Sequence, residues 1–136
     1  MITTNAFQDY QLLDAGDKEK LESWQGIILR RPDPMALWPR LKPEIWDQAM
    51  AIYHRSDKGG GHWEFKKKLP TSWQVRFREL TFKVSPTNFK HTGLFPEQAA
   101  NWELIDRILA GHKNTHILNL FAYSGGATMA AAKAGA

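Results

Sequence analysis

The residues best suited to hold a ligand form the turn Tyr123-Ser124-Gly125-Gly126-Ala127, between an apolar run and an alanine-rich segment. The run is typical of a buried strand and the alanine-rich segment of a helix, so the turn lies at a helix N-terminus. Backbone amides there can approach a ligand carboxylate or hydroxyl groups. The adjacent glycines depart from the GxGxxG order of dinucleotide-binding turns. From the residues alone, an ordinary connecting turn is an equally good interpretation.

A second segment, residues 90–102, precedes this turn and reads KHTGLFPEQAANW. Pro96 suits the first turn of a helix, and Glu97 suits its positive N-terminal end. Helix capping therefore explains both residues without a ligand. That structural interpretation stays open beside a binding role.

The other reactive side chains form no recognisable site. The five histidines are too scattered for metal-ligand spacing, and His112 and His116, four residues apart, straddle a loop and a strand start. Asp57 and Glu64 form no acid/base pair. The chain has no cysteine, which excludes disulfides, thiolate ligands and cysteine nucleophiles. We therefore expect no metal site in this sequence.

The positive charge is concentrated in the middle of the chain. The formal net charge is +4, yet residues 54–90 hold nine Lys or Arg against three Asp or Glu, whereas residues 1–53 hold six against eight. Such a basic segment fits either a phosphate backbone or a solvated β-surface. The run Lys66-Lys67-Lys68 is explained more simply as protection of an edge strand. No apolar run is long enough to span a membrane, so we expect a soluble, cytoplasmic protein without a membrane partner.

Residues 1–88 are typical of a small antiparallel β-rich domain. A period of two over residues 72–78 and 80–85 predicts strands with one buried face, joined by either a bend or a tight turn. Further strands are predicted at residues 10–13, 24–31 and 50–55. Three consecutive glycines predict a loop or tight hairpin over residues 56–62.

The hydrophobic period changes after residue 88. Ala99, Trp102, Ile105 and Leu109 follow helical spacing, and Gly111 suits the helix end. An apolar strand at residues 117–121, the glycine turn and a helix at 128–133 follow. This order predicts a second unit, residues 89–136, that begins a Rossmann-like fold. Its apolar strand needs parallel neighbours, which we expect from residues beyond Ala136.

The sequences of these segments resemble those of a known family. HTGLFPEQAANWELI and ILNLFAYSGGATMAAAKAGA are similar to class I methyltransferases that use S-adenosylmethionine (SAM), specifically bacterial proteins of the ribosomal-RNA type. YQLLDAGDKEKLESWQGIILRRPDPMALWP and YHRSDKGGGHWEFKKKLP resemble the N-terminal region of that family. The resemblance covers nearly the whole chain.

The resemblance implies which residues hold the cofactor. The loop after the first core strand lies against SAM in this family, and its counterparts here are Asn119, Phe121, Ala122, Tyr123, Ser124, Gly125 and Gly126. The segment ahead of the fold packs across the cofactor pocket. Its candidates for the adenosine or methionine ends are Phe95, Pro96, Gln98 and Asn101.

The family's acidic ribose-binding residue and its Asp-Pro-Pro type motif do not occur here. The resemblance therefore implies an α+β to α/β chain with the β-rich domain, the first helix and the first βα unit of the methyltransferase fold, incomplete at Ala136. We expect the N-terminal part of a SAM-dependent methyltransferase that acts on RNA, with half a cofactor site, no recognisable catalytic residue and no activity alone. The alternatives are a non-enzymatic nucleic-acid-binding module and an NAD-dependent oxidoreductase, which the adjacent glycines disfavour.

Overall fold

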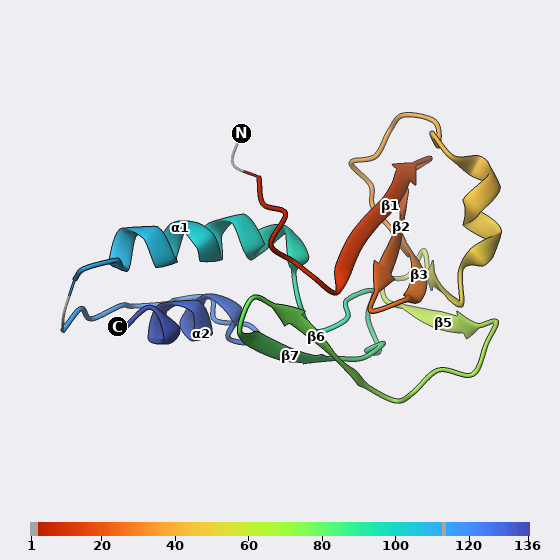
Figure 1. Ribbon diagram of the computed structural model, residues 1–136. Helices are drawn as coiled ribbons and strands as arrows, with labels where there is room; N and C mark the ends of the chain where they lie inside the picture. Colours follow the sequence, from red (N-terminus) through yellow and green to blue (C-terminus); the bar gives the residue numbers. More distant parts are fainter. Residues whose placement is uncertain (1–2, 113) are drawn as a thin grey trace.

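The computed structural model describes residues 3–112 and 114–136, and these form a five-stranded sheet, a two-stranded sheet and two α-helices (Figure 1). The order in the larger sheet is β1-β2-β3-β4-β5. Its strands are β1 (Tyr10–Gly16), β2 (Glu19–Trp24), β3 (Ile27–Pro32), β4 (Ala51–Arg55) and β5 (Gly61–Phe65). The predicted strand at residues 50–55 and the glycine hairpin after it are confirmed.

The single strand predicted over residues 24–31 is wrong, because the chain reverses at Gln25-Gly26. Trp24 pairs with Ile27 across this turn, so the segment contains the end of β2 and most of β3. Both turn residues have positive φ, 53° and 82°, as a type I′ hairpin requires. The apolar residues that follow Gly26 concealed this turn in the sequence.

The predicted antiparallel arrangement of the β-rich unit is wrong at one pairing. β3 and β4 are parallel, with Leu29 opposite Ala51 and Arg30 opposite Ile52. Parallel neighbours need a connection long enough to return the chain to the same end of the sheet. Residues 33–50, which contain the 3-10 helix η1 (Pro43–Gln48), provide that connection.

The smaller sheet is a hairpin of β6 (Trp73–Phe77) and β7 (Leu80–Val84). A tight turn at Arg78-Glu79 joins the two strands, which resolves the choice between a bend and a turn. The alternation predicted from the sequence is confirmed on both strands. Every second residue is buried: Trp73, Val75, Phe77, Leu80, Phe82 and Val84.

The helices α1 (Ala99–Leu109) and α2 (Gly126–Lys133) lie beside this hairpin (Figure 1). A short 3-10 helix, η2 (Pro96–Gln98), leads into α1, with Pro96 in its first turn as predicted. Trp102 of α1 packs on Phe77 and Phe82, with ring centroids 5.2 and 5.3 Å apart. Residues on both sides of position 88 share one buried cluster. The domain boundary near residue 88 stays a prediction.

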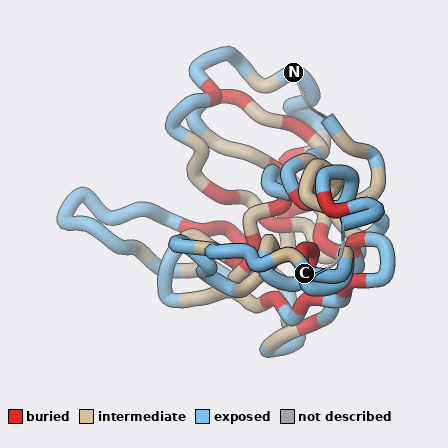
Figure 2. Tube along the Cα trace, turned by 90° about the vertical axis from the view of Figure 1, so that its left-hand side faces the viewer, coloured by how far each residue is buried: buried red, intermediate tan, exposed pale blue. Residues whose placement is uncertain are grey.

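The strand predicted at residues 117–121 does not form. Leu118, Leu120 and Phe121 are 82%, 76% and 94% exposed, although their side chains are apolar. A strand needs a hydrogen-bonded neighbour, and no strand lies beside this segment within the described residues. In Figure 2 the buried residues lie mostly in the interior of the trace, and the outer loops are mostly exposed. In residues 3–112 and 114–136, no helix has the length and apolar character needed to cross a membrane.

Candidate functional site

A cavity of about 450 Å³ lies between the segment that begins α1 and the loop that precedes α2. It brings together seven of the residues predicted to hold a ligand. These are Phe95, Gln98, Phe121, Ala122, Tyr123, Ser124 and Gly126. Its size falls within the roughly 300–1,000 Å³ of small-molecule sites.

The loop before α2 has a backbone that only certain residues adopt easily. Tyr123 and Gly125 have φ of 49° and 85°, in the left-handed region. The amide of Gly125 donates to the carbonyl of Ala122 at 2.7 Å, which closes the loop against the helix. A Cβ added at Gly125 would meet no protein atom within 4 Å. The backbone at Gly125 is therefore open to an approaching ligand.

Gly126 allows α2 to approach α1 closely. A Cβ at this position would lie 2.6 Å from Cζ2 and 3.0 Å from Cε2 of Trp102. Trp102 also lines the cavity, so the same indole ring supports the helix contact and one wall of the site. Glycine is required at position 126 because a side chain would not fit there. The φ of Gly126 is one that any residue can adopt.

Aromatic rings from both bounding segments meet at the cavity. The ring of Phe95 lies 4.7 Å from that of Tyr123 at 33°, and His91 contacts Phe95 edge-on with centroids 5.1 Å apart. Burial, followed by the nearby charges of Arg31, Lys90 and Lys20, lowers the pKa of His91 below its ordinary value of 6.5. At neutral pH the uncharged form of the imidazole beside Phe95 therefore predominates.

A buried ion pair holds the segment that carries His91 and Phe95. Arg31 donates from Nε and Nη2 to Glu22 at 2.6 and 2.9 Å, and from Nη1 to the carbonyl of Lys90 at 2.8 Å. Tyr10 donates its hydroxyl to Glu22 at 2.8 Å. Burial alone would raise the pKa of Glu22, but the Arg31 charge and these hydrogen bonds lower it below its usual range. The larger sheet thus positions the segment through Phe95, which forms one wall of the cavity.

Four of the predicted site residues do not line the cavity. Pro96 is buried at the start of η2, and Gly125 lies between two residues that do line it. Asn101 donates to the Oε1 atom of Gln98 at 2.8 Å. Asn119 donates to Oγ1 of Thr128 at 3.0 Å and so ties the loop to α2. For all eleven residues, a role in binding stays a prediction.

Three lining residues are not among the eleven that the resemblance assigns to the cofactor: Leu94, Trp102 and Ala127. Trp102 was assigned only to the apolar face of α1. It follows Gln98 by four residues, which places both on one side of a helix. Its four-residue spacing from the candidate Gln98 is therefore the feature of the sequence that indicates Trp102 as a lining residue.

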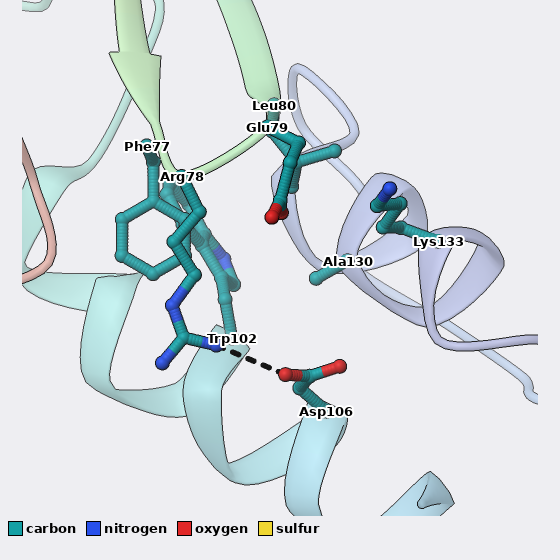
Figure 3. Close-up of a pocket in the computed structure, with 8 residues that line it drawn as sticks. All are labelled: Phe77, Arg78, Glu79, Leu80, Trp102, Asp106, Ala130 and Lys133. Atoms are coloured by element: carbon teal, nitrogen blue, oxygen red, sulfur yellow. Dashed lines mark hydrogen bonds and ion pairs between the residues drawn. The ribbon is translucent and has the colours of Figure 1, made fainter.

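A second cavity, of about 440 Å³, lies between the β6–β7 turn and the two helices (Figure 3). Arg78 crosses it to α1, where Nη1 contacts Asp106 at 2.9 Å and Nη2 contacts Glu103 at 2.8 Å. None of the predicted ligand-binding residues lines this space. In the described part of the chain, no three His, Asp or Glu side chains are grouped to hold a metal ion.

The chain is similar to solved methyltransferase structures. The crystal structure of the SAM-dependent methyltransferase from Agrobacterium tumefaciens is 37% identical, with a TM-score of 0.85 over 98% of this chain and 43% of that one. A Streptococcus mutans protein assigned as a SAM-dependent methyltransferase is 18% identical, with a TM-score of 0.66 over 97% and 38%. SMU.776, assigned as a methyltransferase and complexed with SAH, is 17% identical, with a TM-score of 0.65 over 97% and 37%.

The two more distant structures show similarity of fold alone. The chain spans less than half the length of each of the three proteins. No protein-family model matches the chain, and no curated protein matches it.

Proposed function

We propose that this chain is part of a SAM-dependent methyltransferase and that the cavity between residues 94–102 and 121–127 belongs to its SAM site. The observation that carries this proposal is the similarity, over 98% of the chain at 37% identity, to a SAM-dependent methyltransferase. The position of the cavity supports it, because seven residues assigned to the cofactor from the sequence line one space.

The chemistry of the lining fits SAM. The cofactor combines an aromatic adenine, a ribose, a methionine end and a sulfonium cation. The rings of Phe95 and Tyr123 suit adenine or the sulfonium, because aromatic faces attract both. Ser124 and Gln98 offer polar groups, and the backbone at Gly125 is open for close approach. SAM supplies the methyl group, and the residues of this chain bind and orient the cofactor.

The proposed substrate is RNA, and ribosomal RNA in particular. The excess of basic residues between positions 54 and 90, nine against three acidic ones, supports a phosphate-rich substrate. An RNA substrate of this kind places the proposed site of action in the cytoplasm.

The two alternative functions are less well supported. An NAD-dependent oxidoreductase would need a turn of the GxGxxG type, and Gly125-Gly126 departs from that order. A non-enzymatic nucleic-acid-binding module would account for the basic residues but not for the lined cavity beside α2. No observation favours either over a methyltransferase.

The experiment that tests the reaction is methyl transfer by the full-length protein. SAM labelled with tritium on its methyl group is incubated with the protein and with either ribosomal RNA or a total protein extract. We expect label that ribonuclease releases from the RNA. Label that only protease releases would overturn the RNA substrate, and no transfer to either class would count against the proposed activity.

A further inference from the structure

A shallow groove of about 430 Å³ lies at the end of β5, outside the residues assigned to the SAM cavity. Phe65, Lys67 and Lys68 line it together with Pro70 and Pro86. β5 is an edge strand of the larger sheet, so its outer edge has no paired strand within the described residues. The groove combines an aromatic ring with two cationic side chains.

The ring of Phe65 is held in place yet remains accessible. Its side chain is 54% exposed, and its centroid lies 6.4 Å from the indole of Trp63 at 31°. Trp63 is itself fixed, since its Nε1 donates to the carbonyl of Thr87 at 2.8 Å. A base that stacked on Phe65 would therefore meet a supported ring.

The lysines beside Phe65 have fixed backbones and available charges. The amides of Lys66 and Lys67 both donate to the carbonyl of Met50, at 2.9 and 3.2 Å. Within the described residues, none of Lys66, Lys67 and Lys68 forms an ion pair with a carboxylate. Their ammonium groups are available to anions from outside the chain.

Protection of the edge strand explains the lysines but not the phenylalanine. Lysines on an edge strand prevent sheets from pairing with one another, and that role needs no ligand. An exposed Phe at the same edge adds nothing to this protection, since it carries no charge. The combination is typical of sites for single-stranded nucleic acid, where bases stack on aromatic rings and basic side chains contact phosphates.

We infer that this groove binds an unpaired nucleotide of the RNA substrate, with its base on Phe65 and its flanking phosphates at Lys67 and Lys68. The class of ligand rests on the proposed function, whereas the position rests on the groove itself. Single strands are favoured over duplex because only an unpaired base can present its face to a ring.

The test is fluorescence anisotropy with the full-length protein and a labelled single-stranded RNA. Phe65→Leu keeps an apolar side chain but removes the aromatic face, and we expect roughly 5- to 150-fold weaker binding, the range for loss of one stacked base. Phe65→Trp should retain or tighten binding. The matched control is Phe89→Leu, since Phe89 is 64% exposed but does not line the groove. This control variant should bind the RNA with the same affinity as the unchanged protein.

The lysines are tested by the salt dependence of the same binding. Each phosphate contact on a single strand contributes a slope of about 0.7 in log K against log salt. Lys67→Gln with Lys68→Gln should therefore reduce the slope by about 1.4. Lys42→Gln, at an exposed lysine outside the groove, should leave the slope unchanged.

Three results would overturn the inference: Phe65→Leu binding as tightly as the unchanged protein, duplex RNA of the same sequence binding as tightly as the single strand, or Phe65-dependent binding to anionic vesicles but not to RNA. Calorimetry with SAM on the same samples separates this inference from the proposed function. If SAM binding is unchanged and Phe65→Leu has no effect on RNA binding, the groove is rejected as an RNA site while the proposed function stands.

Discussion

The guanidinium of Arg31 on β3 donates a hydrogen bond of 2.8 Å to the backbone carbonyl of Lys90, 59 residues further along the chain. The same guanidinium is paired with the buried carboxylate of Glu22. One charged group thus connects the larger sheet to the segment that continues through His91 and Phe95 into the proposed SAM cavity. The N-terminal sheet thereby helps to position one wall of this proposed cavity.

Arg31→Met should lower the free energy of unfolding by up to about 3–5 kcal/mol, because the buried carboxylate of Glu22 loses its closer cationic partner and keeps Lys20 at 3.3 Å. Urea unfolding measures this loss. The double variant Arg31→Met with Glu22→Leu should recover part of it, since both buried charges are removed, whereas Lys20 and the Tyr10 hydroxyl lose their partner. A loss below about 1 kcal/mol, typical of exposed pairs, would contradict a buried pair at this position.

Gly126→Ala should lower the free energy of unfolding by about 1–3 kcal/mol, because the new methyl group overlaps the indole of Trp102. Trp102→Phe removes the overlapping atoms, so the two substitutions should be less costly together than the sum of their separate effects. Thermal or urea unfolding of the four proteins of this cycle measures the coupling. Strict additivity would mean that the two residues do not touch.

The stability of the fold should decrease as the pH falls below about 6.5, in part because of His91. Its pKa is lowered in the folded state, so the unfolded chain takes up the proton first and gains stability relative to the folded chain. The contribution is complete above the unfolded value and is lost as the pH falls through the folded one. Urea unfolding between pH 5 and 7.5 should show a shallower decrease for His91→Gln. Identical profiles for the two proteins would refute this role.

Arg78→Gln should have a small effect despite two ion pairs to α1. Its side chain is 40% exposed, and Asp106 is 51% exposed, so water screens the attraction. Exposed pairs contribute about 0.2–1 kcal/mol each. The change in the free energy of unfolding should also decrease as salt is added. A loss of several kcal/mol that persists at high salt would show that Arg78 is more deeply engaged.

Several elements followed directly from local pattern. The hairpin of β6 and β7 was predictable because alternate side chains are buried on one face, and α1 because its apolar residues recur at helical spacing. Pro96 marked the start of the helical segment through its fixed φ. In each case, information in a few consecutive residues was sufficient.

Other features depend on contacts that the local pattern does not contain. The parallel pairing of β3 with β4 arises from the path of residues 33–50, and the run at 117–121 is not a strand because no described strand lies beside it. The Arg31–Lys90 contact joins positions too distant for any spacing rule. The cofactor itself came from family resemblance, since the glycine turn alone fits several ligands.

The most direct test of the central claim is calorimetry of the full-length protein with SAM. We expect saturable binding that Gly125→Val abolishes, because the added side chain would fill the open space at the backbone between Ser124 and Gly126, two residues that line the cavity. Gly59→Val is the matched control. Gly59 has a φ of 88° against 85° at Gly125, and a Cβ there also meets no atom within 4 Å, so the backbone strain is similar. Binding retained in Gly59→Val and lost in Gly125→Val would support the account. Absence of SAM binding in the unchanged protein, or equal affinity in all three proteins, would contradict it.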